Sequence, residues 1–296
     1  NFFVNKYLIF RTDRIGDFLV SAILIKCIKM NDPTSEITVI ASKNNYTYIN
    51  SFPLVDNVIE LKNNFFSKLK LILKIKDIQF KKIIIHDNKK RSLLISFFLK
   101  SNKIIKVKDS NKINHIDIIK NILAEMNFSF FDNALDFLNE KKFKFIDEND
   151  YIQFHFDEKW IHDDYISRYV NIEPTKDELI SLIQNIQKKT RKKILITTGK
   201  IIPKILSELI PETNKLDVKI FKDINFMKLE EITSNASILI ACHGAISHIA
   251  AANNIKQIDI IDKSYNYTRW TKHFRNYNYL YRDTFVSLKN EITKLL

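Results

Sequence analysis

Glycine is nearly absent from this sequence, and proline and cysteine are scarce: 296 residues include three glycines, five prolines and two cysteines. At an average share of about 7%, roughly twenty glycines would be expected. Gly16, Gly199 and Gly244 therefore mark positions where we expect the backbone to need a residue without a side chain. Cys27 and Cys242 lie far apart inside apolar stretches. This spacing indicates neither a disulfide framework nor a cysteine metal site, and it fits a reducing cytosol.

Long apolar runs are also missing. No uninterrupted run approaches the ~18–20 residues of a membrane span. The first ten residues, NFFVNKYLIF, have neither the basic region nor the cleavage pattern of a signal peptide. We therefore expect a soluble, cytoplasmic protein.

Acidic residues are fewer than basic ones, 34 against 47, which gives a formal net charge of +13. This excess favours an anionic partner: nucleic acid, an acidic lipid headgroup or a phosphorylated substrate. It also permits peripheral contact with the acidic inner face of the plasma membrane. The short basic runs at 89–92 and 188–193 are equally typical of plain solvated faces, so charge alone does not choose among these partners.

The composition that remains is that of a folded protein, with 45% hydrophobic and 12% aromatic residues. The length is close to the upper limit of a single core, which favours two domains. Short β-branched runs alternate with helical patterns in both halves, and this alternation predicts parallel sheets covered by helices. The expected strands include residues 7–10, 36–41, 81–87, 102–109, 151–156, 192–199, 215–221, 237–242 and 257–262, and the expected helices include 17–30, 67–75, 91–100, 115–127, 176–189, 226–234, 245–253 and 285–296.

The pattern blurs over residues 128–150 and ends in a polar, acidic stretch that we interpret as a linker. We therefore expect an α/β protein with domains at 1–148 and 149–296, the last helix being able to pack back on the first domain. Ligands of such sheets bind beyond the carboxyl ends of the strands. All three glycines fall at predicted strand ends, so these loops are the candidate functional sites. We interpret Gly16 as the residue that lets the chain turn tightly from the first strand into its helix.

Two of these loops resemble the family 9 glycosyltransferases, the group of ADP-heptose:lipopolysaccharide heptosyltransferases. The stretch YLIFRTDRIGDFLVSAILIKCIK (7–29) is similar to the family's opening strand, its Arg-Thr-Asp-Arg-Ile-Gly-Asp loop and the following helix. The stretch SILIACHGAISHIAAANN (237–254) resembles the family's donor segment, in which the strand ends in Asn-Asp-Ser-Gly. Weaker similarity extends in order along nearly the whole chain.

The resemblance implies a GT-B fold, in which two Rossmann-like domains face a cleft. It also implies an inverting, metal-independent transfer of heptose or a related sugar from a nucleotide-sugar, ADP-linked by preference, to a lipopolysaccharide or another envelope glycan. No cofactor, no nucleic acid and a monomeric state are expected. Inverting transfer needs a base for the acceptor hydroxyl. The resemblance gives that role to Asp17, whereas from the residue alone an acid at a helix start is more often a cap.

Acceptor contacts are expected from cations near the strand ends of the first domain. Arg11 and Arg14 flank a loop that we expect to be open to solvent, and guanidinium groups match phosphate geometry. Lys89, Lys90 and Arg91 follow another strand of that domain and suit an anionic acceptor. A solvated surface role remains the alternative for each of them.

Donor contacts are expected from the second domain. The helix that begins at Ala245 after Gly244 offers unpaired N–H groups to a diphosphate. His243 stands where the family has its acid, and His248 matches the family's histidine. Further candidates follow other strands of this domain and are Lys159, which resembles the family's phosphate-binding lysine, and Thr197, Thr198 and Gly199.

Two further interpretations belong to other function classes. The missing acid at position 243 favours, as an alternative, a degenerate GT-B protein that binds a nucleotide or glycan without turnover. A basic nucleic-acid-binding protein would explain the charge, but the sequence has no recognisable docking motif for one.

Overall fold

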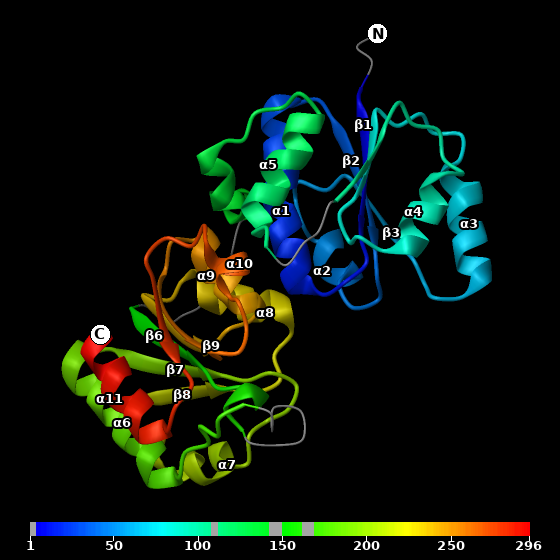
Figure 1. The fold of residues 1–296 in the computed structure, drawn as a ribbon. Coiled ribbons are helices and arrows are strands. Elements are labelled where there is room, and N and C mark those ends of the chain that lie inside the picture. The colour runs from blue at the N-terminus through cyan, green and yellow to red at the C-terminus, as the bar shows by residue number, and fades with distance from the viewer. Residues whose placement is uncertain (1–3, 108–111, 142–149, 162–168) are drawn as a thin grey trace. The chain divides into compact units, whose positions relative to one another are not determined.

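The computed structural model describes residues 4–107, 112–141, 150–161 and 169–296. The chain divides into two compact α/β units (Figure 1). The first contains residues 1–142 together with 268–273, and the second contains 143–267 and 274–296. The acidic end of the predicted linker, 142–149, lies outside the described residues.

The first unit is built on a five-stranded parallel sheet in the order β3-β2-β1-β4-β5. Its strands are β1 Lys6–Arg11, β2 Glu36–Ala41, β3 Asn57–Glu60, β4 Lys82–Ile85 and β5 Ile104–Lys106. Its helices are α1 Ile15–Asn31, α2 Tyr46–Asn50, α3 Phe65–Ile75, α4 Lys90–Ser96, α5 His115–Glu125 and α10 Thr268–Thr271, with a 3₁₀ segment at Asp132–Glu140.

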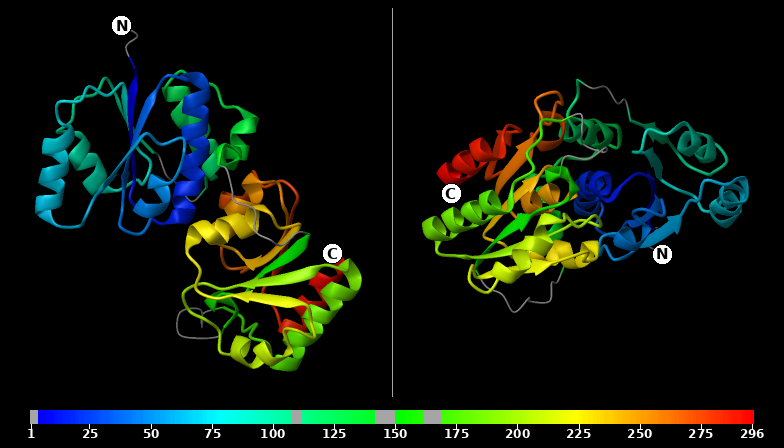
Figure 2. Two further views of the ribbon diagram at one scale, coloured as in Figure 1. Left: turned by 180° about the vertical axis from the view of Figure 1, so that it is seen from behind. Right: turned by 90° about the horizontal axis from the view of Figure 1, so that it is seen from below.

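Both faces of this sheet are covered, which is why its central strands are almost purely apolar. Helices α3 and α4 share one core with β1, β2 and β4, through Leu71, Ile75 and Ile95. Helix α1 packs beside α5 and the 3₁₀ segment (Figures 1 and 2). Because it is covered on several sides, α1 is apolar around most of its circumference, and ten of its seventeen residues are buried.

The second unit is built on a six-stranded parallel sheet in the order β11-β10-β9-β6-β7-β8. Its strands are β6 Tyr151–His155, β7 Lys193–Thr197, β8 Val218–Phe221, β9 Ile238–Cys242, β10 Lys256–Ile261 and β11 Tyr277–Tyr281. Its helices are α6 Lys176–Thr190, α7 Ile205–Leu209, α8 Phe226–Ser234, α9 Ala245–Ala252 and α11 Phe285–Leu295, with 3₁₀ turns at Glu158–Trp160 and Ile210–Glu212. Helices α6, α7 and α11 share one core, and α8 and α9 pack on separate smaller clusters.

Several elements differ from the sequence expectations. Residues 132–140, where the sequence pattern blurs, form a 3₁₀ segment that buries Ala134, Phe137 and Leu138 against the first unit. The last helix belongs to the second unit, because α11 places Phe285 and Ile292 in the core of that unit. The segment that joins the first unit from late in the chain is instead 268–273.

Each strand order reverses once, and this reversal fixes where loops diverge. In the first sheet it lies between β1 and β4, and in the second between β6 and β9. Loops that leave such neighbouring strands run to opposite faces and open a crevice at the carboxyl edge, which is the usual ligand site of open α/β sheets. Two such crevices are therefore expected, one in each unit.

Candidate active site

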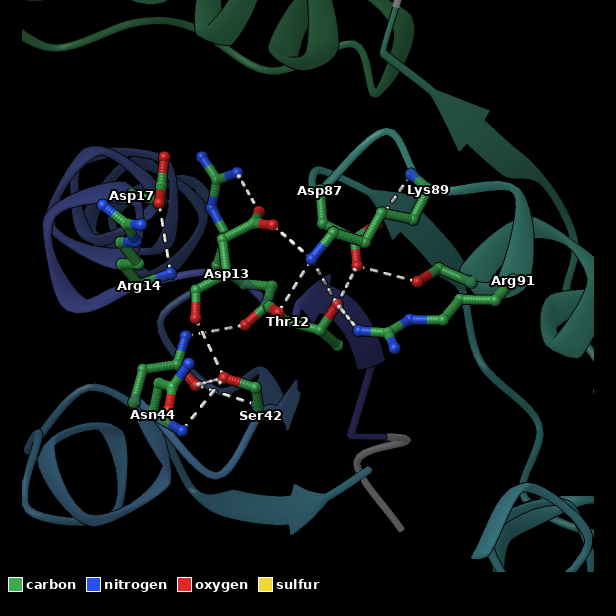
Figure 3. A network of polar contacts seen from close by, with 12 residues as sticks. Thr12, Asp13, Arg14, Asp17, Ser42, Asn44, Asp87, Lys89 and Arg91 are labelled. Atoms are coloured by element: carbon green, nitrogen blue, oxygen red, sulfur yellow. Dashed lines mark hydrogen bonds and ion pairs between the residues drawn. The ribbon is translucent and has the colours of Figure 1, made fainter. Parts of the chain in front are cut away.

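In the first unit, the loops after β1 and β4 are joined by a network centred on Thr12 (Figure 3). The Thr12 hydroxyl donates to Oδ2 of the buried Asp87 at 2.6 Å. The same hydroxyl oxygen accepts from Nη2 of Arg91 at 2.9 Å and from Nζ of Lys89 at 3.2 Å. Lys89 also forms an ion pair with Asp13. The switch point is thus rigidly hydrogen-bonded and lined with cations.

Asp17 occupies the third position of α1, half-buried at this switch point. Its Oδ2 accepts the backbone N–H of Arg14 at 3.1 Å, so it caps the helix start (Figure 3). Oδ1 makes no hydrogen bond with any residue that the structure describes. The sequence interpretation of Gly16 as the turn residue is wrong, because Gly16 is the second residue of α1 and no described glycine has a positive φ. The turn itself is formed by residues 12–14.

A pocket of about 250 Å³ lies beside Asp17, over the ends of β1, β4 and β5. His86, His115 and Trp270 line it, Trp270 being contributed by the segment 268–273 of the same unit. The rings of His115 and Trp270 stack with their centroids 3.9 Å apart. Nε2 of each histidine is buried without a hydrogen-bond partner among the described residues. The pocket thus offers a carboxylate and an aromatic ring, and two buried ring nitrogens without partners belong to the residues of its wall.

Both histidines of this pocket are held in the neutral form. Burial lowers the pKa of His115 to about 3, and the charges of Arg11, Arg269 and His273 act in the same direction. Burial, followed by the charge of Arg11, also lowers the pKa of His86 well below its ordinary value. Neutral imidazoles beside a carboxylate suit the recognition of hydroxyl groups.

A second, larger groove of about 1150 Å³ lies across the ends of β1 to β4 and is open to solvent. Its lining includes five cations against the single acid Glu60: Lys43, Lys62, Lys89, Lys90 and Arg91. Such a groove attracts an anionic ligand, because several positive charges surround one hollow.

The acceptor candidates from the sequence separate into two groups. Lys90 and Arg91 line the basic groove, as does Lys89, whose ammonium is largely committed to Thr12 and Asp13. Arg14 is exposed beside Asp17. The expectation that Arg11 flanks an open loop is wrong: it is 5% exposed, and its guanidinium donates to Ser21 Oγ at 2.7 Å and to the His86 carbonyl at 2.9 Å. Arg11 therefore supports the wall of the smaller pocket.

In the second unit, the turn after β6 lies against both of the remaining glycines. A Cβ atom on Gly244 would meet Nζ of Lys159 at 2.9 Å, and one on Gly199 would meet Oε2 of Glu158 at 2.8 Å. Both distances are shorter than ordinary contacts, so the side-chain-free positions make room for the 157–159 turn. The structure thus brings together Lys159, Gly199 and Gly244, three donor candidates that lie far apart in the sequence.

The ammonium of Lys159 is held at this place by a buried acid. Nζ of Lys159 lies 2.8 Å from Oδ2 of Asp157, which lies 3.5 Å from Nε2 of His155. Burial opposes the charge on both members, but the Lys159 ammonium outweighs it and lowers the pKa of Asp157, while Asp157 raises the pKa of Lys159. The Lys159 side chain remains 30% exposed, so a charged group faces solvent at the switch point.

His243 follows β9 and is paired with a carboxylate from the next strand. Its Nδ1 lies 2.6 Å from Oδ2 of Asp259, a residue of β10 that is 1% exposed. Asp259 also accepts from the hydroxyls of Ser247 at 2.9 Å and Tyr277 at 3.0 Å, and Ser247 Oγ accepts the N–H of Gly244 at 3.2 Å. Because a carboxylate only accepts, Nδ1 must carry the proton, which leaves Nε2 of a neutral ring as an acceptor.

The other donor candidates lie deeper. His248, within α9, has its ring 5.7 Å from that of His243 and is almost buried. Ala245 is the first residue of α9. Thr197 is fully buried, with its hydroxyl bonded to Gln153 and His155, and the Thr198 hydroxyl accepts the Asp223 N–H at 3.0 Å. The structure places both threonine hydroxyls in internal contacts below the surface.

In the second unit, sequence reasoning missed three residues that hold the candidate donor loops. Asp259 is the one acid within strand β10, KQIDII, and an acid in the middle of an apolar strand was the available signal. Asp157 had no such signal beyond its place after a strand. Arg282, which is 6% exposed, donates to the Lys159 carbonyl at 2.7 Å and so fixes the 157–159 turn. Among the described residues, no group of three acids, histidines or cysteines is arranged to hold a metal ion.

The structure is similar along almost its whole length to solved heptosyltransferases. It matches the E. coli heptosyltransferase WaaC with ADP at a TM-score of 0.72, with 11% identity, covering 98% of this chain and 100% of that chain. It matches E. coli ADP-heptose lps heptosyltransferase II at 0.69, with 13% identity, covering 98% of each chain. A glycosyl transferase family 9 protein from Veillonella parvula matches at 0.63, with 10% identity, covering 99% of this chain and 90% of that chain. No family model matches the sequence, and neither does any curated protein.

These likenesses and the two parallel-sheet units show that the chain has a GT-B fold of the heptosyltransferase type. The resemblance seen in the two loops is thereby confirmed at the level of the fold. At identities of 10–13%, activity has to be argued from the residues themselves.

Proposed function

We propose that the chain is an inverting glycosyltransferase that moves a sugar, heptose or a related one, from a nucleotide-sugar to a hydroxyl of an anionic glycolipid or envelope glycan. The observation that carries the proposal is chemical complementarity at the two switch points. The first bears a carboxylate beside a basic groove, as an anionic acceptor requires, and the second bears an ammonium and a helix N-terminus, as a diphosphate requires.

Asp17 is the proposed base. Its free Oδ1 takes the proton of the acceptor hydroxyl as that oxygen attacks the anomeric carbon. The bond from the anomeric carbon to the diphosphate oxygen breaks in the same step, and the nucleoside diphosphate leaves with the electron pair. Attack from the face opposite the leaving group inverts the configuration. The cap contact of Oδ2 with Arg14 orients the carboxylate for this task.

The acceptor occupies the two hollows of the first unit in this proposal. The sugar that carries the reacting hydroxyl stacks on Trp270 in the smaller pocket, where Asp17 and the neutral His115 contact its hydroxyls. Anionic groups of the acceptor lie in the basic groove against Lys90 and Arg91. Aromatic rings present an apolar face to sugar rings, and guanidinium groups suit phosphate.

The donor is held by the second unit. Lys159 and the N-terminus of α9 stabilise the negative charge that develops on the leaving diphosphate. Nε2 of His243 accepts a hydrogen bond from a donor hydroxyl, which is the role a carboxylate at this position would perform. ADP is the proposed diphosphate, because two similar structures of the E. coli heptosyltransferase WaaC contain ADP and ADP-2-deoxy-2-fluoro heptose. We propose that no metal takes part.

The alternative of a binding-only protein drew its support from the missing acid at position 243. Asp259 weakens that support, because it places a buried carboxylate behind the His243 ring and fixes the ring's tautomer. The candidate base at Asp17 and the ammonium at Lys159 are also retained. Transfer is therefore the function that these residues favour.

The test begins with a thermal-shift screen of ADP-, UDP-, GDP- and CMP-linked sugars. The stabilising donor is then used in a transfer assay with anionic glycolipid acceptors, and product is detected by mass spectrometry. We expect Asp17→Asn to lower kcat by at least about a hundredfold while donor binding is unchanged. The matched control is Glu178→Gln, because Glu178 also caps its own helix by accepting an N-cap N–H at 2.8 Å. Full turnover by Asp17→Asn would refute the base, and the absence of stabilisation by every donor would refute the proposed function.

A further inference from the structure

Helices α3 and α4 of the first unit carry an unusual concentration of exposed apolar side chains. Among the described residues, every phenylalanine and leucine exposed to solvent lies on these two helices or directly after α4. We call this surface the α3–α4 face, and it consists of Phe65, Phe66, Leu69, Leu73, Leu94, Phe97 and Phe98, each between 43% and 79% exposed. Exposed apolar clusters of this kind mark interaction surfaces.

The two helices lie side by side at one edge of the first unit, as Figures 1 and 2 both show. They pack on the same core through their other sides, with Leu71 and Ile75 of α3 and Ile95 of α4 buried together. The buried stripe and the exposed stripe thus use different sides of each helix. The exposed side chains are therefore not part of the hydrophobic core, because other residues of the two helices already cover this face of the sheet.

The charge around the α3–α4 face is predominantly positive, and the neighbouring Asp77 is paired with Lys100. Residues 61–76 contain five lysines and no acid, and residues 88–100 contain three lysines, one arginine and no acid. On α3, Lys68, Lys70 and Lys74 form no ion pair with any residue that the structure describes. Unpaired cations next to exposed phenylalanines are the composition of surfaces that lie in the headgroup region of an anionic bilayer.

The face also continues into the basic groove of the same unit. Lys62 and Asn63, which line the groove, directly precede α3, and Lys90 and Arg91 line it from the first turn of α4. A membrane that contacts the face would bring its anionic headgroups to the mouth of that groove. A protein partner would instead need a matching acidic, apolar surface, and nothing in the groove's position calls for one.

We infer that the α3–α4 face docks on an anionic lipid bilayer, with Phe65, Phe66, Phe97 and Phe98 inserted among the acyl chains and the flanking lysines at the headgroups. No described helix is long and apolar enough to cross a membrane, so this contact is peripheral. The inference concerns membrane binding alone and stands independently of the proposed transfer reaction.

The experiment is co-sedimentation of the full chain with vesicles. One set contains phosphatidylcholine only, and the other contains about one third phosphatidylglycerol. We expect binding to the anionic vesicles at least about tenfold tighter than to the neutral ones, weakening as salt is added. Wild-type protein that stays in the supernatant with anionic vesicles would overturn the inference.

Two sets of variants separate the apolar contribution from the electrostatic one. Replacing the four phenylalanines by serine removes the inserting groups, and K68E/K70E/K74E reverses the charge of α3. Each lysine near an anionic surface is worth about fivefold in affinity, so we expect the charge variant to bind about a hundredfold more weakly. The matched control is K188E/K204E/K222E, which makes the same charge change at exposed lysines of the second unit.

All substituted side chains project from the surface, so urea unfolding should show that the variants stay folded. F97S/F98S is the second apolar variant, because both residues lie beyond the last residue of α4. A charge variant that binds like wild type would contradict the inference. So would a serine variant that loses self-association in light scattering yet keeps its vesicle binding, because the face would then be a contact between two copies of the chain.

Discussion

His243 and Asp259 form a hydrogen-bonded pair across neighbouring strands, with Nδ1 and Oδ2 2.6 Å apart. The pair joins the loop after β9 to the middle of β10. β9 is one of the two strands between which the strand order of this sheet reverses. Ser247 and Tyr277 donate to the same carboxylate, so Asp259 ties the start of α9 and Tyr277 of β11 to one buried charge. A single strand residue thus fixes the geometry of the proposed donor loop.

The pair predicts a specific pattern of stability in a double-mutant cycle. His243→Asp places a second carboxylate against the buried Asp259, and we expect it to lower the free energy of unfolding by about 3 kcal/mol. Asp259→Asn should cost about 1–2 kcal/mol, because a weaker hydrogen bond to His243 remains. In the double variant, the new aspartate accepts a hydrogen bond from the new asparagine. We therefore expect the free energy of unfolding of the double variant to be at least about 1 kcal/mol higher than the value obtained by adding the two single effects.

Urea unfolding of the four proteins measures this cycle, and calorimetry with ADP-sugar measures donor affinity in parallel. His248→Asn is the control, since His248 lies next to His243 without a place in the cycle. Strict additivity of the two single effects would contradict an energetic coupling between His243 and Asp259.

The two glycines of the second unit make a matched test of the diphosphate contact. Gly244→Ala would push the flexible ammonium of Lys159 away, and Gly199→Ala would push the equally flexible carboxylate of Glu158. Both backbones are compatible with alanine, so we expect both variants to stay within about 1 kcal/mol of the wild-type stability. We expect only Gly244→Ala to weaken ADP binding, by about tenfold, because charge-assisted hydrogen bonds of this kind contribute about 1.5–3 kcal/mol.

Isothermal calorimetry with ADP compares these variants, and Lys159→Met gives the effect of removing the charge altogether. Wild-type affinity in both Gly244→Ala and Lys159→Met would rule out Lys159 as a phosphate contact. Equal losses in the two alanine variants would show that crowding of the 157–159 turn, and not the ammonium, controls binding.

The sequence predicted most of the architecture because the central strands of both sheets are buried on both faces. Runs such as EITVIA and SILIAC can then be recognised from their β-branched residues alone; β2 spans Glu36–Ala41 as expected, and β9 spans Ile238–Cys242. Two of the edge strands lack that signal, whereas the edge strands β5 and β8 were predicted. β3 and β11 are partly exposed along their length, and neither NVIE nor YNYLY stands out from a loop.

The parts of the site that the sequence did not predict depend on contacts between distant segments. Trp270 lies 155 positions after His115 in the chain, yet the two rings stack. Asp259 lies on a different strand from His243, and its role follows from the parallel register that sets it opposite Ala241. The interpretation of Gly16 was wrong for a local reason: the tight turn is closed by side-chain bonds around Thr12 and needs no left-handed residue. Local pattern located the loops, but the partners of each side chain come from the register of the sheets.

The neutral His115 predicts how stability depends on pH. Its pKa is lowered to about 3 by burial and by neighbouring positive charges, whereas in the unfolded chain it returns to its ordinary value of 6.5. Below pH 6.5 the unfolded chain therefore binds more protons than the folded protein, so the stabilising contribution is complete above that pH and is lost as the pH falls toward 3. The expected loss is about 1.4 kcal/mol per pH unit, or about 2 kcal/mol between pH 7 and pH 5. His115→Phe keeps the stack on Trp270 but has no titrating group. Between pH 7 and pH 5 this variant should therefore lose about 2 kcal/mol less stability than the wild type. Urea unfolding of both proteins at pH 7 and pH 5 measures the difference between the two losses. The contributions of the carboxylates and of His86 to the pH dependence cancel in this difference, because both proteins contain these groups. Equal losses in the two proteins would show that His115 is not held neutral in the folded state.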